Sequence, residues 1–343
     1  MSTRRTHRWV PGALALGLAV AAACKGEPAG GAAGAPLRLG FFPNLTHAQA
    51  LVGNGEGLFA QEVGVPVTVR QFNAGPAAME ALLAGDVDVS YVGPGPAVIA
   101  YLRSGGAALN VVAGAASGGA VLVTREARSA RELVGKRVAS PQLGNTQDIA
   151  LRVWLRQQGL RSGERPGEVR VMPLANSDII GLFARGELAG AWVPEPWGAR
   201  LVAEAGGHIL VDERDLWPDR QFPTTVIVAS RRALEGRRRD VVAFLRAHLA
   251  LTARWKADPA AFARAANAEY GKITGHPLPD RVLQDAFSRL EPNAEPLTDQ
   301  LVRGAQDAQG LKYAPPGDVR GLVDRGPLEE AKREGGRRQA KRP

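Results

Sequence analysis

The sequence predicts an α/β fold in two lobes, each built on a largely parallel sheet flanked by helices. The first observation is a regular alternation, from Leu37 onward, of short β-prone runs with amphipathic helical runs. The second is length, because the chain that follows the first 23 residues is a little over 300 residues long and exceeds a single ordinary core. The chain therefore has enough residues for two lobes.

Two series of alternating elements account for most of this pattern. In the first, β-prone runs predict strands and runs with one apolar helical face predict helices. The strands fall over residues 37–42, 67–72, 87–92 and 109–114, and the helices over 47–62, 77–85 and 96–105. The second series has strands over 136–141, 169–174, 188–193 and 208–212, and helices over 146–159, 177–186 and 196–206. A strand over 224–230 follows, and then helices to about Leu301 with a break at Gly275–Pro279.

The first 23 residues have the organisation of a signal peptide. Three arginines precede an apolar run, Val10 to Ala23, which ends in three alanines directly before Cys24. A cysteine at that place is typical of a lipoprotein, in which the thiol receives a diacylglycerol and becomes the mature N-terminus. The alternative is an ordinary buried cysteine. The apolar run has 14 residues, fewer than the roughly 20 that cross a bilayer. Residues 24–36, rich in Gly and Ala, are expected to be a flexible tether.

The distribution of charge argues against a nucleic-acid-binding protein. The formal net charge is +9, but residues 1–23 carry +3 and residues 331–343 carry +5, so residues 24–330 carry only +1. We expect residues 326–343 to form a basic, disordered tail that is attracted to a membrane surface. Cys24 is the only cysteine of the chain, so no disulfide can form within it.

Polar turns follow the predicted strands, at the edge where α/β sheets bind ligands. Asn44 or Thr46 can cap the next helix, which leaves free backbone N–H groups there. Helix N-termini that converge on one cleft can hold a phosphate, sulfonate or carboxylate without Arg or Lys, and these turns contain no basic residue except His47. Trp192 and Trp197, near Glu195, are either core residues or an apolar wall beside a polar pocket.

The sequence contains no recognisable catalytic or metal-binding motif. It lacks C-x-x-C, G-x-x-x-x-G-K-[ST], H-E-x-x-H and G-x-S-x-G, and its five histidines lack the spacing of metal ligands. No nucleophile is paired with a base. We therefore expect a binding protein without enzymatic activity, cofactor or metal.

Several stretches resemble a known family of transport proteins. The chain is similar to the lipid-anchored substrate-binding proteins of bacterial ABC importers, in the aliphatic sulfonate, taurine and nitrate group. The resemblance is carried by GFFPNLTHAQALVG (40–53), FNAGPAAMEALLAGDVDVSYVGPGPA (72–97), VAGAASGGAVLV (112–123), ASPQLGNTQDIALRVWL (139–155), AWVPEPWGARLV (191–202) and VDERDLWPDRQFPTTVIV (211–228).

The resemblance implies a type II periplasmic-binding fold with a ligand cleft between the lobes. Residues 37–121 and 225–325 would form lobe one, and residues 122–224 lobe two. By motif position, the ligand would contact Asn44, Thr46, His47, Gly93, Ser117, Gly118, Asn145, Thr146, Trp192, Glu195 and Trp197. Glu195 would repel an anion if it faced inward, so it would instead hold the hinge or face a cationic part of the ligand.

The implied function is capture of a small organic anion, most simply an aliphatic sulfonate, by lobe closure. The protein would be a monomer on the outer side of a cell-envelope membrane, tethered by lipid, and would deliver the ligand to an ABC permease. Alternative ligands are nitrate, bicarbonate and a thiamine-precursor pyrimidine. The alternative of another class is an exported enzyme on the same scaffold.

Overall fold

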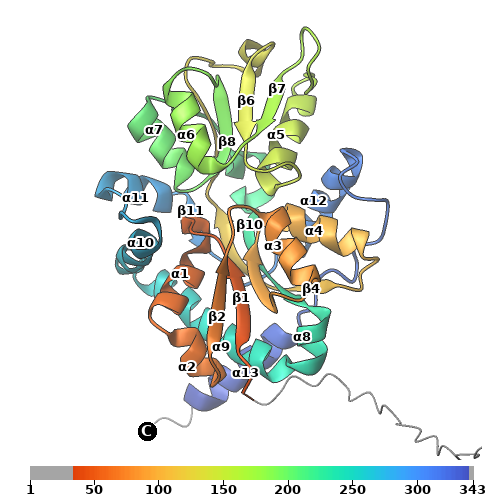
Figure 1. Ribbon diagram of the computed structural model, residues 1–343, viewed down its shortest axis with the longest axis vertical. Helices are drawn as coiled ribbons and strands as arrows, with labels where there is room; N and C mark the ends of the chain where they lie inside the picture. Colours follow the sequence, from red (N-terminus) through yellow and green to blue (C-terminus); the bar gives the residue numbers. More distant parts are fainter. Residues whose placement is uncertain (1–33, 340–343) are drawn as a thin grey trace, which may run out of the picture. The chain divides into compact units, whose positions relative to one another are not determined.

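The structure, a computed structural model, describes residues 34–339. Its first sheet has six strands in the order β11-β4-β10-β3-β1-β2 (Figure 1). These strands are β1 (Leu37–Phe41), β2 (Val67–Gln71), β3 (Val89–Val92), β4 (Leu109–Gly118), β10 (Pro223–Ser230) and β11 (Leu290–Pro292). The helices of this lobe are η1 (Leu45–His47), α1 (Ala48–Gly55), α2 (Leu58–Val63), α3 (Gly75–Leu83), α4 (Pro94–Arg103), α8 (Arg231–Gly236), α9 (Arg238–Ala257), α10 (Pro259–Thr274), α11 (Asp280–Phe287), α12 (Thr298–Gly310) and α13 (Gly326–Gln339).

The second sheet has five strands in the order β7-β6-β8-β5-β9. They are β5 (Ala120–Thr124), β6 (Arg137–Ser140), β7 (Arg170–Pro173), β8 (Gly190–Pro194) and β9 (His208–Asp212). The helices of this lobe are η2 (Ala130–Leu133), α5 (Thr146–Gln157), α6 (Asn176–Ala184), α7 (Trp197–Ala205), η3 (Glu213–Leu216) and η4 (Pro218–Arg220). The predicted α/β class is therefore correct.

Both sheets are mixed, which corrects the prediction of largely parallel sheets. β1 runs parallel to β2 and β3, and β6 runs parallel to β7 and β8. β10 is antiparallel to β3 and β4, β11 to β4, and β5 to β8 and β9. The cause is the route of the chain: β4 leaves the first sheet, and β10 returns beside it with Pro223 opposite Ser117. A strand that enters a sheet where its neighbour leaves runs antiparallel to that neighbour.

Two glycines make the crossover from the first sheet to the second. Gly118 and Gly119 have φ angles of 75° and 74°, which are in the left-handed region. A Cβ on Gly118 would overlap the carbonyl oxygen of Arg289, and a Cβ on Gly119 would overlap the side chain of Leu290. The change of sheet thus takes place at Gly119, whereas the boundary was expected after residue 121.

The expected elements between residues 37 and 230 are present, with local differences. The helix expected over 47–62 is divided into α1 and α2 at Gly57, whose φ of 69° interrupts it. β4 continues to Gly118, and β5 follows as a separate strand that was not expected. The short strand β11 was also missed, and α12 continues well beyond Leu301.

Each sheet is covered by apolar side chains on both faces. Along β10, Ile227 and Ala229 belong to the core beneath α1 and α9, whereas Val226 and Val228 belong to the core beneath α3, α4 and α12. This alternation is the period of two of a strand that is buried on both faces. In the second sheet, Trp192 packs toward α5 on one face.

The predicted disordered tail is wrong for residues 326–339, which form α13. Leu328 and Ala331 are fully buried in the core of the first lobe, and α13 contacts α9. The charged face is paired, because Lys332 Nζ lies 2.6 Å from Glu295 and Glu334 contacts Arg246. Two apolar residues three positions apart anchor an otherwise charged helix, and such a sparse pattern is hard to recognise. Residues 340–343 lie outside the described part. No helix within residues 34–339 is apolar and long enough for a membrane span.

Candidate functional site

A small polar pocket lies where the carboxyl ends of strands from both sheets meet. Its empty volume is about 300 Å³. None of the residues that line it carries a full charge at neutral pH. The lining residues are Phe42, Asn44, Thr46, His47, Asn73, Gly93, Asn145, Gln147, Asn176, Pro194 and Thr224. Five of the predicted binding residues are therefore brought together: Asn44, Thr46, His47, Gly93 and Asn145. We call this space the polar pocket.

His47 is a neutral hydrogen-bond donor in this pocket. Burial lowers the pKa of His47 to about 3, so the imidazole is uncharged at neutral pH. The backbone N–H of Phe42 donates to its Nδ1 at 3.3 Å, and the Phe42 ring stacks on it. Because Nδ1 accepts, Nε2 carries the proton of the neutral ring.

Asn44 links the two lobes across the polar pocket. Its Oδ1 accepts a hydrogen bond from the indole Nε1 of Trp197 at 3.0 Å, and Trp197 begins α7 in the second lobe. Neither Asn44 nor Thr46 caps the following helix through its side chain, so that expected role is not observed. Trp197 is half-buried, and the guanidinium of Arg200 lies 5.0 Å from its ring centre.

Asn145 is positioned by the start of α5 and by a buried carboxylate. Its Oδ1 accepts the N–H of Thr146 at 2.8 Å. Asp148, which is fully buried, accepts from Ser140 Oγ and from the N–H of Gly144, and so fixes the turn that carries Asn145. The phenol of Tyr313, from the first lobe, also donates to Asp148 at 2.9 Å. The sequence reading did not identify Asp148.

Thr146 lies in the contact between the lobes rather than in the polar pocket. Its Oγ1 accepts the N–H of Gly95 at 3.2 Å, where the first turn of α4 meets the first turn of α5. A Cβ on Gly93 would overlap that hydroxyl, so glycine is required at this close approach. Ser117 and Gly118 also lie outside the pocket. Phe222 N–H donates to Ser117 Oγ, and Thr224 Oγ1 donates to the carbonyl of Gly118, so both residues join the crossover strands.

Trp192 is a core residue, which corrects the predicted tryptophan wall. It is fully buried, packs edge-on against Trp154, and donates from Nε1 to Glu213 Oε2 at 2.8 Å. Along β8, Ala191 and Val193 face the opposite side of the sheet. Burial raises the pKa of Glu213 to about 7, against the smaller opposing effect of the indole donors.

Glu195 holds the two lobes together through a buried ion pair. Its Oε1 accepts from Arg289 Nε at 2.6 Å, and its Oε2 accepts the N–H of Ala199 at 3.0 Å. Arg289 belongs to the first lobe, just before β11, and is also held by Asp285. Burial raises the pKa of the Glu195 carboxyl, while Arg289 opposes that shift. Both of its carboxylate oxygens accept hydrogen bonds from the protein. Glu195 therefore makes the contacts expected of a residue that holds the hinge, and not those of a residue that binds a ligand.

The polar pocket opens into a wider outer groove with an empty volume of about 1110 Å³. Asn73 and Asn176 line both spaces. The apolar residues of the groove are Phe72, Ala74, Ala77, Pro141, Leu143, Pro173, Leu174 and Ala175. Apolar surface is therefore available beside the polar pocket, although not where the tryptophans were expected to provide it.

Some pocket residues carried a signal in the sequence, and others did not. Asn73 follows a predicted strand, and Gln147 lies in the first turn of α5 shortly after another, so their positions already indicated them. Asn176 begins α6 after β7, and its Oδ1 is buried without a hydrogen-bond partner among the described residues. Thr224 lies within β10, where a threonine carries no such signal. Among residues 34–339, no group of three or more His, Cys, Asp or Glu could hold a metal ion.

A family model covers most of the chain that builds this site. The model of the NMT1-like family matches residues 30–269, well over half of the chain. The chain belongs to the NMT1-like family.

One relative of this NMT1-like protein is named as a binding protein. The taurine-binding periplasmic protein of Escherichia coli (strain K12) is 30% identical over 171 residues, which are 49% of this chain and 50% of that protein. The match thus spans about half the length of that relative.

Solved structures share the fold. The alkanesulfonate-binding protein SsuA from Xanthomonas axonopodis pv. citri, bound to MOPS, has a TM-score of 0.67 at 21% identity, covering 87% of this chain and 97% of that one. The periplasmic nitrate-binding protein NrtA from Synechocystis PCC 6803 has a TM-score of 0.73 at 15% identity, covering 88% of each chain. The fold implied by the resemblance is confirmed, with two mixed sheets flanked by helices.

The buried ion pair at the hinge predicts a large effect of one substitution. Arg289→Ala leaves the Glu195 carboxylate buried without its cation, so we expect the free energy of unfolding to fall by about 3–5 kcal/mol. Urea denaturation measures this loss. Arg320→Ala, which removes an exposed ion pair with Asp318, is the control and should leave stability unchanged. A loss as small as that of the control would contradict the role of Arg289.

The raised pKa of Glu213 predicts a dependence of stability on pH. Between pH 4.5 and 7 the folded state binds a proton at Glu213 that the unfolded state has released, so folding stability falls as pH rises through this window. Relative to Glu213→Gln, the wild-type protein should lose about 3 kcal/mol as pH rises from 4.5 to about 8, and nothing further above that. Urea denaturation at stepped pH measures the difference, in which His47 and all other titrating groups cancel. A difference that does not vary with pH would refute the assignment.

Proposed function

We propose that this NMT1-like protein is the solute-binding component of an ABC importer and captures a small organic anion, most simply an aliphatic sulfonate. The observation that carries the proposal is the polar pocket, which is lined by hydrogen-bonding groups and by no charged side chain. Helix N-termini and neutral donors bind anions without fixed positive charge. In this proposal the protein acts outside the cytoplasm and passes its ligand to a membrane permease.

The orientation of two amides supports an anion rather than a cation. Asn44 Oδ1 is occupied by Trp197, and Asn145 Oδ1 is occupied by the N–H of Thr146. Each side chain therefore has its NH₂ group available for a ligand. Neutral His47 adds a donor of the same kind, and oxygen atoms of a sulfonate accept from such groups.

The body of the ligand would lie in the outer groove. Asn73 and Asn176 line the passage from the polar pocket, and Phe72, Leu143 and Leu174 supply apolar surface beyond it. This arrangement replaces the proposed wall of Trp192 and Trp197. No carboxylate lines the polar pocket, so an ammonium group would meet only neutral acceptors such as Asn176 Oδ1. An alkanesulfonate therefore fits this description better than a zwitterion.

Nitrate and bicarbonate remain the alternative ligands, because each needs only the polar pocket. The affinity for nitrate or bicarbonate would not depend on the outer groove, whereas the affinity for a longer alkanesulfonate would. A pyrimidine would need the groove without an anionic head. The enzymatic alternative lacks support, since the pocket residues include no nucleophile paired with a base.

Isothermal titration with methane-, propane- and butanesulfonate, taurine, nitrate, bicarbonate and a pyrimidine tests the proposal. We expect the affinity to increase along the alkanesulfonate series, because each buried CH₂ adds about 0.8 kcal/mol. Asn145→Ala should weaken every sulfonate by about 1–2 kcal/mol through loss of one hydrogen bond to a charged group.

In the same experiment, Leu143→Ala separates the binding contribution of the ligand's anionic head from that of its apolar body. Leu143 is 55% exposed in the groove, and Leu83, which is 51% exposed and does not line it, gives the matched control Leu83→Ala. Leu143→Ala should weaken butanesulfonate about three- to tenfold and leave methanesulfonate unchanged. Binding of nitrate alone would replace the sulfonate proposal, and absence of binding by every anion would refute anion capture.

We further propose that Cys24 is acylated after cleavage behind Ala23 and anchors the protein to a membrane. The support is the sequence alone, since Cys24 lies outside the described residues: an arginine-rich start and an apolar run precede the only cysteine. The wild-type protein should partition into detergent on phase separation, whereas Cys24→Ser should stay in the aqueous phase. Partition of both proteins into the aqueous phase would contradict acylation.

A further inference from the structure

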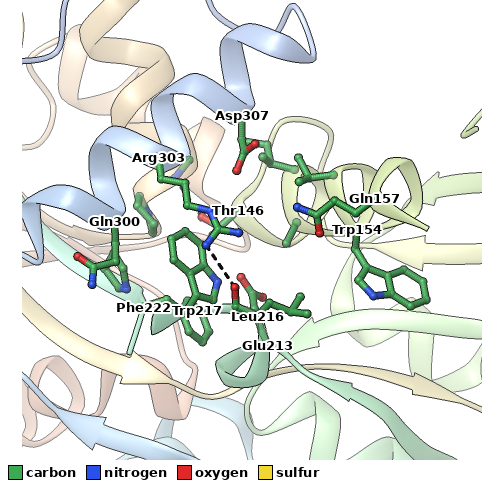
Figure 2. Close-up of a pocket in the computed structure, with 17 residues that line it drawn as sticks. Thr146, Trp154, Gln157, Glu213, Leu216, Trp217, Phe222, Gln300, Arg303 and Asp307 are labelled. Atoms are coloured by element: carbon green, nitrogen blue, oxygen red, sulfur yellow. Dashed lines mark hydrogen bonds between the residues drawn. The ribbon is translucent and has the colours of Figure 1, made fainter. Parts of the chain in front are cut away.

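A second pocket lies on the other side of the contact between Gly95 and Thr146. It shares no residue with the polar pocket, and its empty volume is about 620 Å³. Its walls come from α4 and α12 of the first lobe, α5 and η3 of the second, and the chain that returns to β10. Figure 2 shows the side chains that line it. We call it the hinge pocket.

The hinge pocket is largely apolar and aromatic. Trp217 is stacked on Phe222, with ring centres 5.9 Å apart. Ile149, Val153 and Leu216 complete this surface. Such walls suit the apolar body of a small organic ligand, and a few placed polar groups then set its orientation.

The polar groups of the hinge pocket include two carboxyl groups, in contrast to the polar pocket, which has none. Glu213 and Asp307 line it, and Glu213 is only 2% exposed. Its one cation, Arg303, is already engaged: the guanidinium lies 4.2 Å from the ring centre of Trp217 and donates to the carbonyl of Leu216 at 3.2 Å (Figure 2). Outside the lining, Arg156 is 3.8 Å from Asp307.

The buried carboxyl of Glu213 is incompletely compensated. Its Oε2 accepts from the neutral indole of Trp192, and the indole of Trp217 and the charge of Arg303 also oppose the rise of its pKa. No salt bridge to it occurs among residues 34–339. The nearby Arg214 is paired with Asp212 instead. Burial accordingly raises the pKa of Glu213. A cationic ligand would supply the missing partner, because a buried carboxylate is stabilised by a charge-assisted hydrogen bond.

We propose that the hinge pocket is a second binding site, for a small organic amine with a flat or aliphatic body. The ammonium group would donate to Glu213, and the body would lie against Trp217, Phe222 and Ile149. The site accepts the charge opposite to that proposed for the polar pocket. It does not depend on the identity of the transported ligand.

Gly304 offers a way to close the hinge pocket without disturbing the fold. It lies on α12 and lines the pocket, and a Cβ placed on it would meet no atom within 4 Å. Gly304→Leu should therefore fill the pocket. Gly336 on α13 is also helical with no atom within 4 Å of a Cβ, so Gly336→Leu is the matched control.

The experiment is isothermal titration of the full mature chain with benzylamine and butylamine, with benzyl alcohol and benzoate as uncharged and anionic comparisons. We expect benzylamine to bind at least tenfold more tightly than benzyl alcohol or benzoate. Gly304→Leu should weaken benzylamine at least tenfold, and Gly336→Leu should not. Glu213→Gln should reduce the preference for benzylamine over benzyl alcohol to less than threefold. Thermal melting verifies that each variant is folded.

Three outcomes would overturn the proposal. One is that neither amine binds the wild-type protein at millimolar concentration. Another is that benzylamine binds a folded Gly304→Leu variant as tightly as the wild type, which would place the amine elsewhere. The last is equal affinity for benzylamine and benzoate, which would remove the role of Glu213. None of them depends on sulfonate binding, so this test and that of the polar pocket fail separately.

Discussion

The buried pair of Glu195 and Arg289 is the interaction on which the two-lobed arrangement depends. Glu195 follows β8 directly, so the ion pair fixes the end of the strand whose neighbouring residue, Pro194, lines the polar pocket. Arg289 also has its carbonyl oxygen packed against Gly118 in the crossover. A charge pair withdrawn from water tolerates little change of geometry, because either member alone is strongly unfavourable. The crossover, the hinge and the pocket wall are therefore coupled through one residue, Arg289.

The polar pocket avoids this electrostatic constraint by using neutral groups. The side-chain oxygens of Asn44 and Asn145 each accept a hydrogen bond from a neighbouring residue, and this bond orients the amide without a charge. His47 is kept neutral by burial. Neutral donors need no counterion when the pocket is empty, so no buried charge is left there without a partner. The carboxyl groups of the hinge pocket lie behind the contact between Gly95 and Thr146, on the other side from these donors.

The sequence predicted the elements well wherever periodicity was strong, and failed where a role depended on distant partners. The alternation of strands and helices placed Asn44, His47, Gly93 and Asn145 after the carboxyl ends of strands, where α/β sheets bind ligands. Nothing local to Trp192 distinguishes a core indole from a pocket wall, since its partner Glu213 lies 21 residues away. The helix α13 was missed because its stability comes from burial of Leu328 against α9 rather than from its own composition.

The direction of β1 separates the amino end of the described chain from the polar pocket. Arg237 donates to the carbonyls of Ala35 and Pro36, which fixes the chain at the amino end of β1. The polar pocket is reached only at the other end of that strand, roughly 16 Å further along five residues. The amino end of β1 and the polar pocket thus lie at opposite edges of the same sheet.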